Sequence, residues 1–129
     1  MNPQTSLFSD VQKKINTMHL FSPVIVGPLP VGNGIAMQLA TSRNDSIYYS
    51  HNVIYTINVL LLCKHDNQIV ACDTLHQIGN YLQRGNWYPF IRDEYQWLKS
   101  EVTTGSQFVT QQENGKFIYS AVIDVTAHF

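Results

Sequence analysis

The stretch FVTQQENGKFIYSAVIDV, residues 108–125, contains the strongest local signal for the fold. Asn114-Gly115 is the favoured pair for a two-residue β-hairpin turn, because both central residues of that turn need a positive φ. After the turn, apolar side chains alternate with Ser120, Asp124 and Thr126, as they do in a strand with one buried face. The chain is therefore predicted to end in a hairpin that pairs residues 106–113 with residues 116–127.

A helix is predicted before this hairpin, over residues 66–84. Its apolar stripe recurs at spacings of four, three and four, which places one face on the core: Ala71, Leu75, Ile78 and Leu82. Asp66 is the expected N-cap, and Gly85 follows the last turn. Gly79 lies inside the helix, where glycine costs about 1 kcal/mol relative to alanine. We therefore expect Gly79 to pack closely against a strand.

The first half of the chain is predicted to hold a helix and two main strands. Apolar positions three and four apart indicate a helix over residues 4–18, and a proline- and glycine-rich connector with a short strand at 24–26 follows. Alternating patterns predict strands over 35–40 and 52–63. The polar residues 41–51 between these strands are predicted to form the long tip of a hairpin.

The order of these elements predicts an α+β fold. Helix, strand, strand, helix, strand and strand follow one another, with a fifth strand at 95–103. Such an order gives a mixed, mostly antiparallel sheet of four to five strands with the helices packed on one face. The 129 residues are the size of one domain, 1–129, with an extended hairpin loop at about 41–51.

Composition excludes several classes of protein. Hydrophobic residues make up 44% of the chain, which excludes a disordered protein. The net charge of −1 argues against an ordinary, strongly basic nucleic-acid binder. No apolar run reaches the roughly 18 residues of a membrane span, and the first residues do not form a signal peptide. A protein with so little charge and so many uncharged polar residues suits contact with other proteins.

The sequence holds no motif for catalysis, cofactor binding or a metal site. The five histidines share no ligand spacing, and the nucleotide-binding and hydrolase motifs are absent. Cys63 continues the apolar face of a strand, and Cys72 adjoins the buried stripe of a helix, so both are expected to be buried, unreactive thiols. We therefore predict that the protein is not an enzyme and binds no cofactor or metal.

Two groups of residues are candidates for a protein interface. The 41–51 loop is long for a hairpin connection and contains Arg43 and Asn44 together with Tyr48 and Tyr49. Arginine and aromatic residues are enriched in interfaces. A second candidate group is the aromatic segment that begins with Trp87 and Tyr88. The alternative is that these aromatic side chains fold back on the sheet or cap the core.

The whole pattern resembles the tail terminator proteins of long-tailed bacteriophages, also known as minor capsid or tail-completion proteins. The resemblance rests on the N-terminal helix and on several stretches that follow in order: VGPLP (26–30), the strand at 35–40, TSRNDS (41–46), LLLCK (60–64), VTTGSQFV (102–109) and NGKFIY (114–119). The likeness lies in the order of the elements, the length of the chain and the general character of these stretches, because no invariant catalytic motif defines this family.

The resemblance implies a structural role in a virion. Such proteins form a homohexameric ring that caps the tail tube protein, ends polymerisation of the tube and joins the tail to the head-tail connector protein. The genome passes through the ring, so weak or no specific DNA binding is expected, and no membrane is involved. The protein would be assembled in the bacterial host cytoplasm and reside at the head-proximal end of the tail. The alternatives are a head-completion or stopper protein, a small α+β enzyme, and a cellular binding module.

Overall fold

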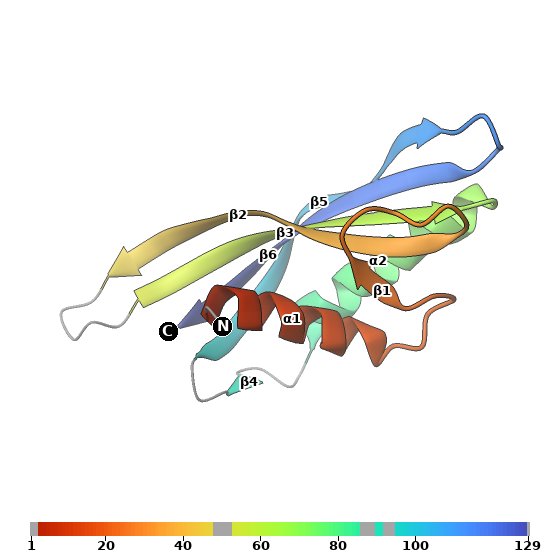
Figure 1. Cartoon of the computed structure of the whole chain (residues 1–129). Coiled ribbons are helices and arrows are strands. Elements are labelled where there is room, and N and C mark those ends of the chain that lie inside the picture. Colours follow the sequence, from red (N-terminus) through yellow and green to blue (C-terminus); the bar gives the residue numbers. More distant parts are fainter. Residues whose placement is uncertain (1–2, 48–52, 86–89, 92–94, 129) are drawn as a thin grey trace.

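The described residues form two helices and six strands (Figure 1). The structure is a computed structural model, and it describes residues 3–47, 53–85, 90–91 and 95–128. The elements follow in the order α1 (Pro3–Asn16), β1 (Val24–Val26), β2 (Gly34–Ile47), β3 (Val53–His65), α2 (Gln68–Arg84), β4 (Phe90–Ile91), β5 (Gln96–Gln111) and β6 (Phe117–His128). No helix in these ranges is long and apolar enough to cross a membrane.

All six strands belong to one sheet, in the order β1-β2-β3-β6-β5-β4. The β1–β2 pair is parallel and the other neighbouring pairs are antiparallel. Both helices pack on the same face of this sheet (Figure 1). The predicted fold class, an α+β fold with a mixed, mostly antiparallel sheet, is confirmed. The sheet exceeds the expected four to five strands because the short β1 and β4, of three and two residues, occupy its edges.

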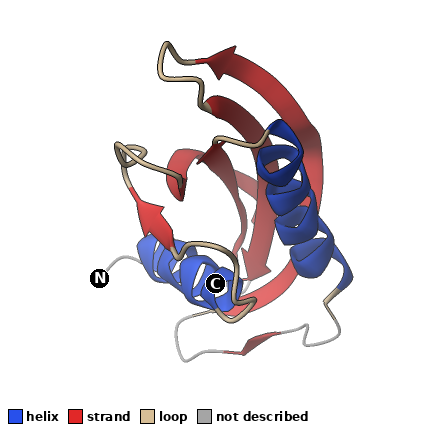
Figure 2. Cartoon of the chain, turned by 90° about the vertical axis from the view of Figure 1, so that its right-hand side faces the viewer, coloured by secondary structure: helices blue, strands red, loops and turns tan. Residues whose placement is uncertain are grey.

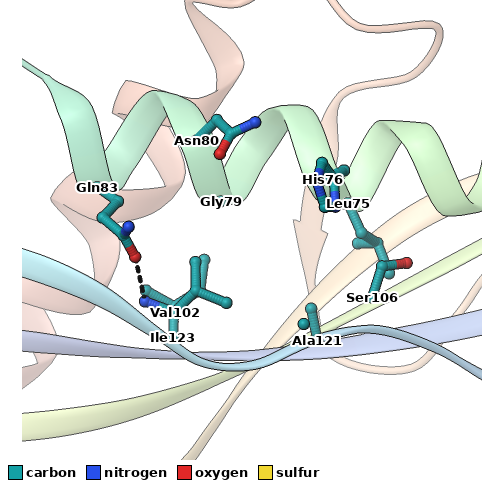
Figure 3. A pocket seen from close by; sticks show the side chains of 10 residues that line it. Leu75, His76, Gly79, Asn80, Gln83, Val102, Ser106, Ala121 and Ile123 are labelled. Atoms are coloured by element: carbon teal, nitrogen blue, oxygen red, sulfur yellow. Dashed lines mark hydrogen bonds between the residues drawn. The ribbon is translucent and has the colours of Figure 1, made fainter.

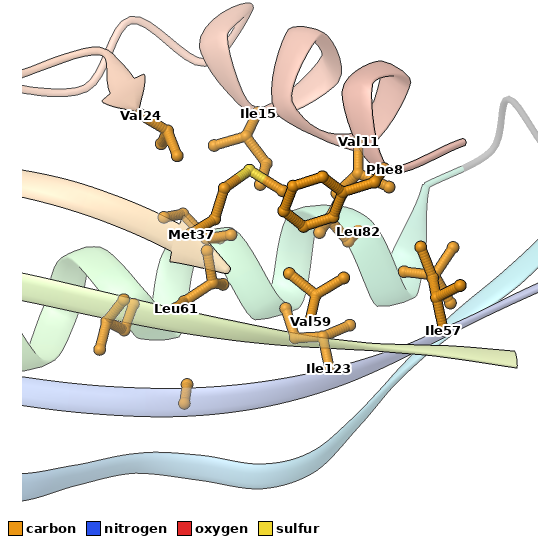
Figure 4. Packing of buried hydrophobic residues seen from close by; sticks show 14 of the residues in the cluster. Phe8, Val11, Ile15, Val24, Met37, Ile57, Val59, Leu61, Leu82 and Ile123 are labelled. Atoms are coloured by element: carbon orange, nitrogen blue, oxygen red, sulfur yellow. The ribbon is translucent and has the colours of Figure 1, made fainter. Parts of the chain in front are cut away.

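The hydrophobic core lies between the helices and the sheet (Figure 4). The helices contribute apolar stripes, and β2, β3 and β6 contribute alternate residues of one face. The fully buried side chains from the helices are Leu7, Val11, Ile15, Ala71, Ile78 and Leu82, and those from the three strands include Met37, Ile57, Leu61 and Val125. Burial of each large aliphatic side chain stabilises the fold by about 1.5–3 kcal/mol. In Figure 2 the sheet is strongly curved, and the two helices lie apart on it.

The C-terminal hairpin forms as predicted, but its turn has a different geometry. Gly115 N donates to Gln112 O at 2.9 Å, and Gln112 N donates to Lys116 O at 2.8 Å. Gly115 has a φ of 87°, whereas Asn114 is not among the described residues with positive φ. The connection is therefore a three-residue loop, a turn followed by a left-handed glycine, rather than the predicted two-residue turn.

The N-cap of helix α2 is Asn67, one residue after the predicted cap, Asp66. The Asn67 side-chain oxygen accepts hydrogen bonds from Ile69 N at 2.9 Å and Val70 N at 3.4 Å, so Asn67 is the N-cap. Asp66 instead forms an ion pair with Lys116 across 2.8 Å. Asp66 and Asn67 are adjacent, and both residue types can cap a helix. The prediction for Asp66 was wrong because Lys116, which is distant in sequence, binds Asp66 and leaves Asn67 as the cap.

Two predicted boundaries between strand and loop were also wrong. Strand β2 continues to Ile47, and its residues 41–47 pair with β3, so most of the predicted 41–51 loop is strand. The separate strands expected at 95–103 and 106–113 are one strand, β5. Polar residues in these two stretches interrupt the alternation of apolar and polar side chains by which a strand is recognised in a sequence. Backbone pairing with a neighbouring strand tolerates such residues where one face is open to solvent.

Candidate interaction surfaces

The predicted interface residues fall in three places. Arg43 and Asn44 lie in β2, where their backbones are paired with Thr56 and Tyr55 of β3. Figure 1 shows the β2–β3 hairpin extending past helix α1. Tyr48 and Tyr49, and likewise Trp87 and Tyr88, lie outside the described residues. The role of all six residues in an interface stays a prediction.

The cysteines are placed as the sequence suggested. Cys63 is fully buried on β3, and Cys72 is half-buried on α2. Burial raises the pKa of the Cys63 thiol to about 12, and a hydrogen bond with Thr74 acts in the opposite direction. A thiol with this pKa remains protonated at neutral pH, and the thiolate is the nucleophilic form. Cys63 is therefore a packing residue of the core.

The described part of the chain contains no group of three or more His, Cys, Asp or Glu side chains that could hold a metal ion. A polar cluster in this part of the chain joins three loops. Lys116 Nζ lies 2.8 Å from both Asp66 Oδ1 and Asn33 Oδ1, and Asn33 Nδ2 donates to Asp66 Oδ2 at 3.4 Å. The neighbouring Lys116 lowers the pKa of Asp66. This cluster links the ends of β2, β3 and β6, which is a structural role.

The outer edge of β1 is partly covered by side chains of α1, which bind the backbone of Val24. Asn16 Oδ1 accepts from Val24 N at 2.7 Å, and Gln12 Nε2 donates to Val24 O at 2.8 Å. These two bonds occupy backbone groups that would otherwise pair with another strand. Side chains that cover an edge are a recognised protection against edge-to-edge association.

The opposite edge is formed by the two-residue β4 and, where β4 has ended, by β5, which is irregular. Strand β5 has 16 residues and its partner β6 has 12, and four register shifts take up the difference. Gln83 Oε1 of α2 also accepts from Val102 N at 2.9 Å. Bulges bend a strand and disrupt its hydrogen-bonding edge. Neither edge therefore presents a long, regular template for an added strand.

A pocket lies between α2 and β5 (Figure 3). Its volume is about 110 Å³, and Leu75, Val102, Ala121 and Ile123 supply its apolar lining. Polar side chains of α2 lie around it, namely His76, Asn80 and Gln83. The lining also includes Gly79, Gly105 and Ser106. Among the described residues, the Ser106 hydroxyl is a buried polar group without a hydrogen-bond partner in the chain.

One exposed apolar side chain lies on the connection between β1 and β2. Val31 is 91% exposed, more than any other large apolar side chain in the described ranges. It follows Pro30, which packs so closely on Gly34 that a Cβ there would lie 2.4 Å from Pro30 Cγ. Val31 and the pocket were not predicted from the sequence. The sequence features that could have pointed to Val31 are its neighbours, a proline and a glycine. Those that could have pointed to the pocket are the glycines inside a helix and a strand, which indicate close approach or open space.

Comparison with known proteins gives a likeness of fold alone. No protein-family model matches the sequence, and no curated protein matches it. Among solved structures, one similar chain belongs to a particle described as "Virion of native gene transfer agent (GTA) particle". The two chains are 9% identical, with a TM-score of 0.58 over 82% of this chain and 78% of the other. This protein thus shares its fold with a chain of a virion particle.

Proposed function

We propose that this protein is a structural component of a phage-like virion, specifically the tail terminator. In this role, copies of the chain form a ring, hexameric by the resemblance, on the last ring of the tail tube. The ring stops polymerisation of the tube protein and presents a surface to the head-tail connector. The protein is then found at the head-proximal end of the tail, after assembly in the bacterial cytoplasm.

The observation that carries this proposal is the fold shared with a chain of a gene transfer agent virion over 82% of the protein. The sequence resemblance to tail terminators points in the same direction. The buried, protonated Cys63 thiol and the loop-joining Lys116 cluster are structural features, which supports a non-enzymatic role without a cofactor.

The charge of the chain agrees with passage of a genome through the ring. Each phosphate that a protein neutralises adds affinity for DNA, so a strongly basic lumen would retain the duplex. Eight Lys and Arg residues against nine Asp and Glu residues leave a net charge of −1. This balance supports the proposal of weak or no specific DNA binding.

The test is the mass of the assembled protein, measured by light scattering with and without the purified tail tube protein of the same particle. We expect a species six times the 14.7 kDa of one chain, and caps at one end of tubes of arrested length in negative-stain images. A Tyr48→Ala/Tyr49→Ala variant should fold normally but assemble less. A protein that stays monomeric and leaves tube growth unchanged would contradict the terminator role, and binding to the connector alone would indicate a head-completion or stopper protein.

A further inference from the structure

We infer that the pocket between α2 and β5 of one copy receives the Val31 side chain of a neighbouring copy, and that this contact joins successive subunits. The inference rests on the proposed function, since it names a contact by which copies of this chain would close into a ring. The occupant is thus a second copy of the same chain, presented through the loop between β1 and β2.

The Val31 loop is held in a defined shape. At its start, Gly27 N donates to Met37 O at 3.2 Å, and Gln38 Nε2 donates to Gly27 O at 3.1 Å. At its end, Asn33 accepts from Lys116 Nζ at 2.8 Å. Pro30 fixes its own φ and packs against Gly34. A side chain presented on such a loop loses little conformational entropy when it docks, which favours binding.

The pocket matches this side chain in size and character. The pocket between α2 and β5 has a volume of about 110 Å³, and Gly79 and Gly105 are among the residues that line it. An apolar cavity of roughly 150 Å³ takes in a benzene ring, so a valine side chain fits within this space. Leu75 and Ile123 provide the apolar contacts that an aliphatic side chain needs (Figure 3).

The polar groups of the pocket match the main chain of the loop. Ser106 offers a buried hydroxyl that has no hydrogen-bond partner in the part of the chain that the structure describes. Buried polar groups in native proteins almost always have a partner, so this hydroxyl calls for one from outside. Pro30, next to Val31, has no N–H and offers only a carbonyl acceptor. A bond from Ser106 Oγ to a carbonyl beside Val31 would satisfy both groups.

The positions of the loop and the pocket suit a ring. The loop adjoins β1 at one edge of the sheet, and the pocket adjoins β5 near the other edge. Contact between two different patches on successive copies is heterologous, and heterologous contacts generate rings when the rotation closes. Because both strand edges are covered or irregular, such copies would meet through side chains. The net charge of −1 adds little repulsion between them.

The test uses one variant on each side of the contact. Val31→Asp places a charge on the loop, and Ser106→Leu puts a larger apolar side chain where the buried Ser106 hydroxyl lines the pocket. Ile69→Asp is the matched control, since Ile69 is 70% exposed on α2 and does not line the pocket. We expect each pocket or loop variant to assemble about tenfold more weakly or worse, a typical loss at an interface hot spot. The control should assemble like the original protein, and all three should keep their unfolding midpoints.

Mixing the two variants gives the decisive readout. Val31→Asp retains an open pocket, and Ser106→Leu retains the valine, so an equimolar mixture can make one intact contact per pair. We expect dimers with one copy of each variant, and no ring. If Val31→Asp or Ser106→Leu forms rings as the original protein does, the contact is wrong while the terminator role stands. If the original protein never self-associates, alone or on the tube, both proposals fail.

Discussion

Gly79 shows how a single side-chain position can couple a helix to a strand. Alanine in place of glycine inside a helix usually stabilises it by about 1 kcal/mol. Here an added Cβ would lie 2.9 Å from Val102 Cγ2 of β5, and overpacking costs about 1–3 kcal/mol. We expect Gly79→Ala to lower the free energy of unfolding by about 1 kcal/mol, measured by urea denaturation.

The matched control for Gly79→Ala is the same change in a Val102→Ala background. With the valine methyl groups gone, the helix-propensity gain should remain and the sign of the effect should reverse. A Gly79→Ala protein that is more stable than the original would contradict the close contact. The prediction of close packing at this glycine, made from the sequence, is confirmed by the 2.9 Å distance.

The buried thiol of Cys63 makes stability depend on alkaline pH. Its pKa is about 12 in the folded chain, against an ordinary value of 9.0, so the folded state holds its proton more tightly than the unfolded state. The stabilising contribution is complete below pH 9 and is lost as the pH rises from 9 towards 12. The loss approaches about 1.4 kcal/mol per pH unit for one proton.

Urea unfolding of the original protein and of Cys63→Ala between pH 7 and 11 measures this dependence. Other groups titrate in the same range, so the difference between the two proteins isolates the thiol. Cys72→Ala should keep the alkaline slope, and Cys63→Ala should lose part of it. Parallel curves for the original protein and Cys63→Ala would show that Cys63 is not the source.

At the scale of elements, Asp66 and Asn67 were both candidates for the cap of α2, and the structure gives them different roles. Asn67 accepts hydrogen bonds from two backbone N–H groups of the first turn, whereas Asp66 contacts Lys116 and Asn33. Loss of an N-cap costs about 1 kcal/mol. We expect Asn67→Ala to destabilise the protein by that amount regardless of salt. Asp66→Ala should have a smaller effect that fades in 1 M salt, because an exposed ion pair is screened. An equal or larger loss in Asp66→Ala would favour the aspartate as the cap.

Most elements of the fold could be predicted from local patterns. The apolar stripe of α2 and the alternation in β3 and β6 directly indicate their period and their buried face. The continuation of β2 to Ile47 and the fusion of two predicted strands into β5 could not be predicted in this way. Both depend on backbone pairing with a partner distant in sequence, and backbone groups pair whatever their side chains. The turn at Gly115 has the same explanation. The sequence predicted its positive φ, but the length of the loop depends on how the two strands pair.

At the scale of the whole molecule, the surfaces were harder to predict than the core. A core residue is recognisable because burial selects apolar side chains at a regular spacing. The pocket between α2 and β5 is lined by residues of α2, β5 and β6, which come together only after the helix has packed on the sheet. Val31 lies alone in a connector, where no periodic pattern distinguishes it. The composition did suggest contact with other proteins, but not which residues make it.

The covered outer edge of β1 and the irregular edge of β5 bear on the behaviour of the protein at high concentration. At high concentration, exposed strand edges on separate copies of a protein can pair with one another. A chain with two bare, regular sheet edges would recruit its own kind into fibres of unlimited length. With Val24 bound by Asn16 and Gln12 on one side, and Val102 bound by Gln83 on the other, part of each edge is closed to such pairing. Association of copies of this chain is thereby directed away from open-ended strand pairing and towards contacts between side chains, which can be limited in number.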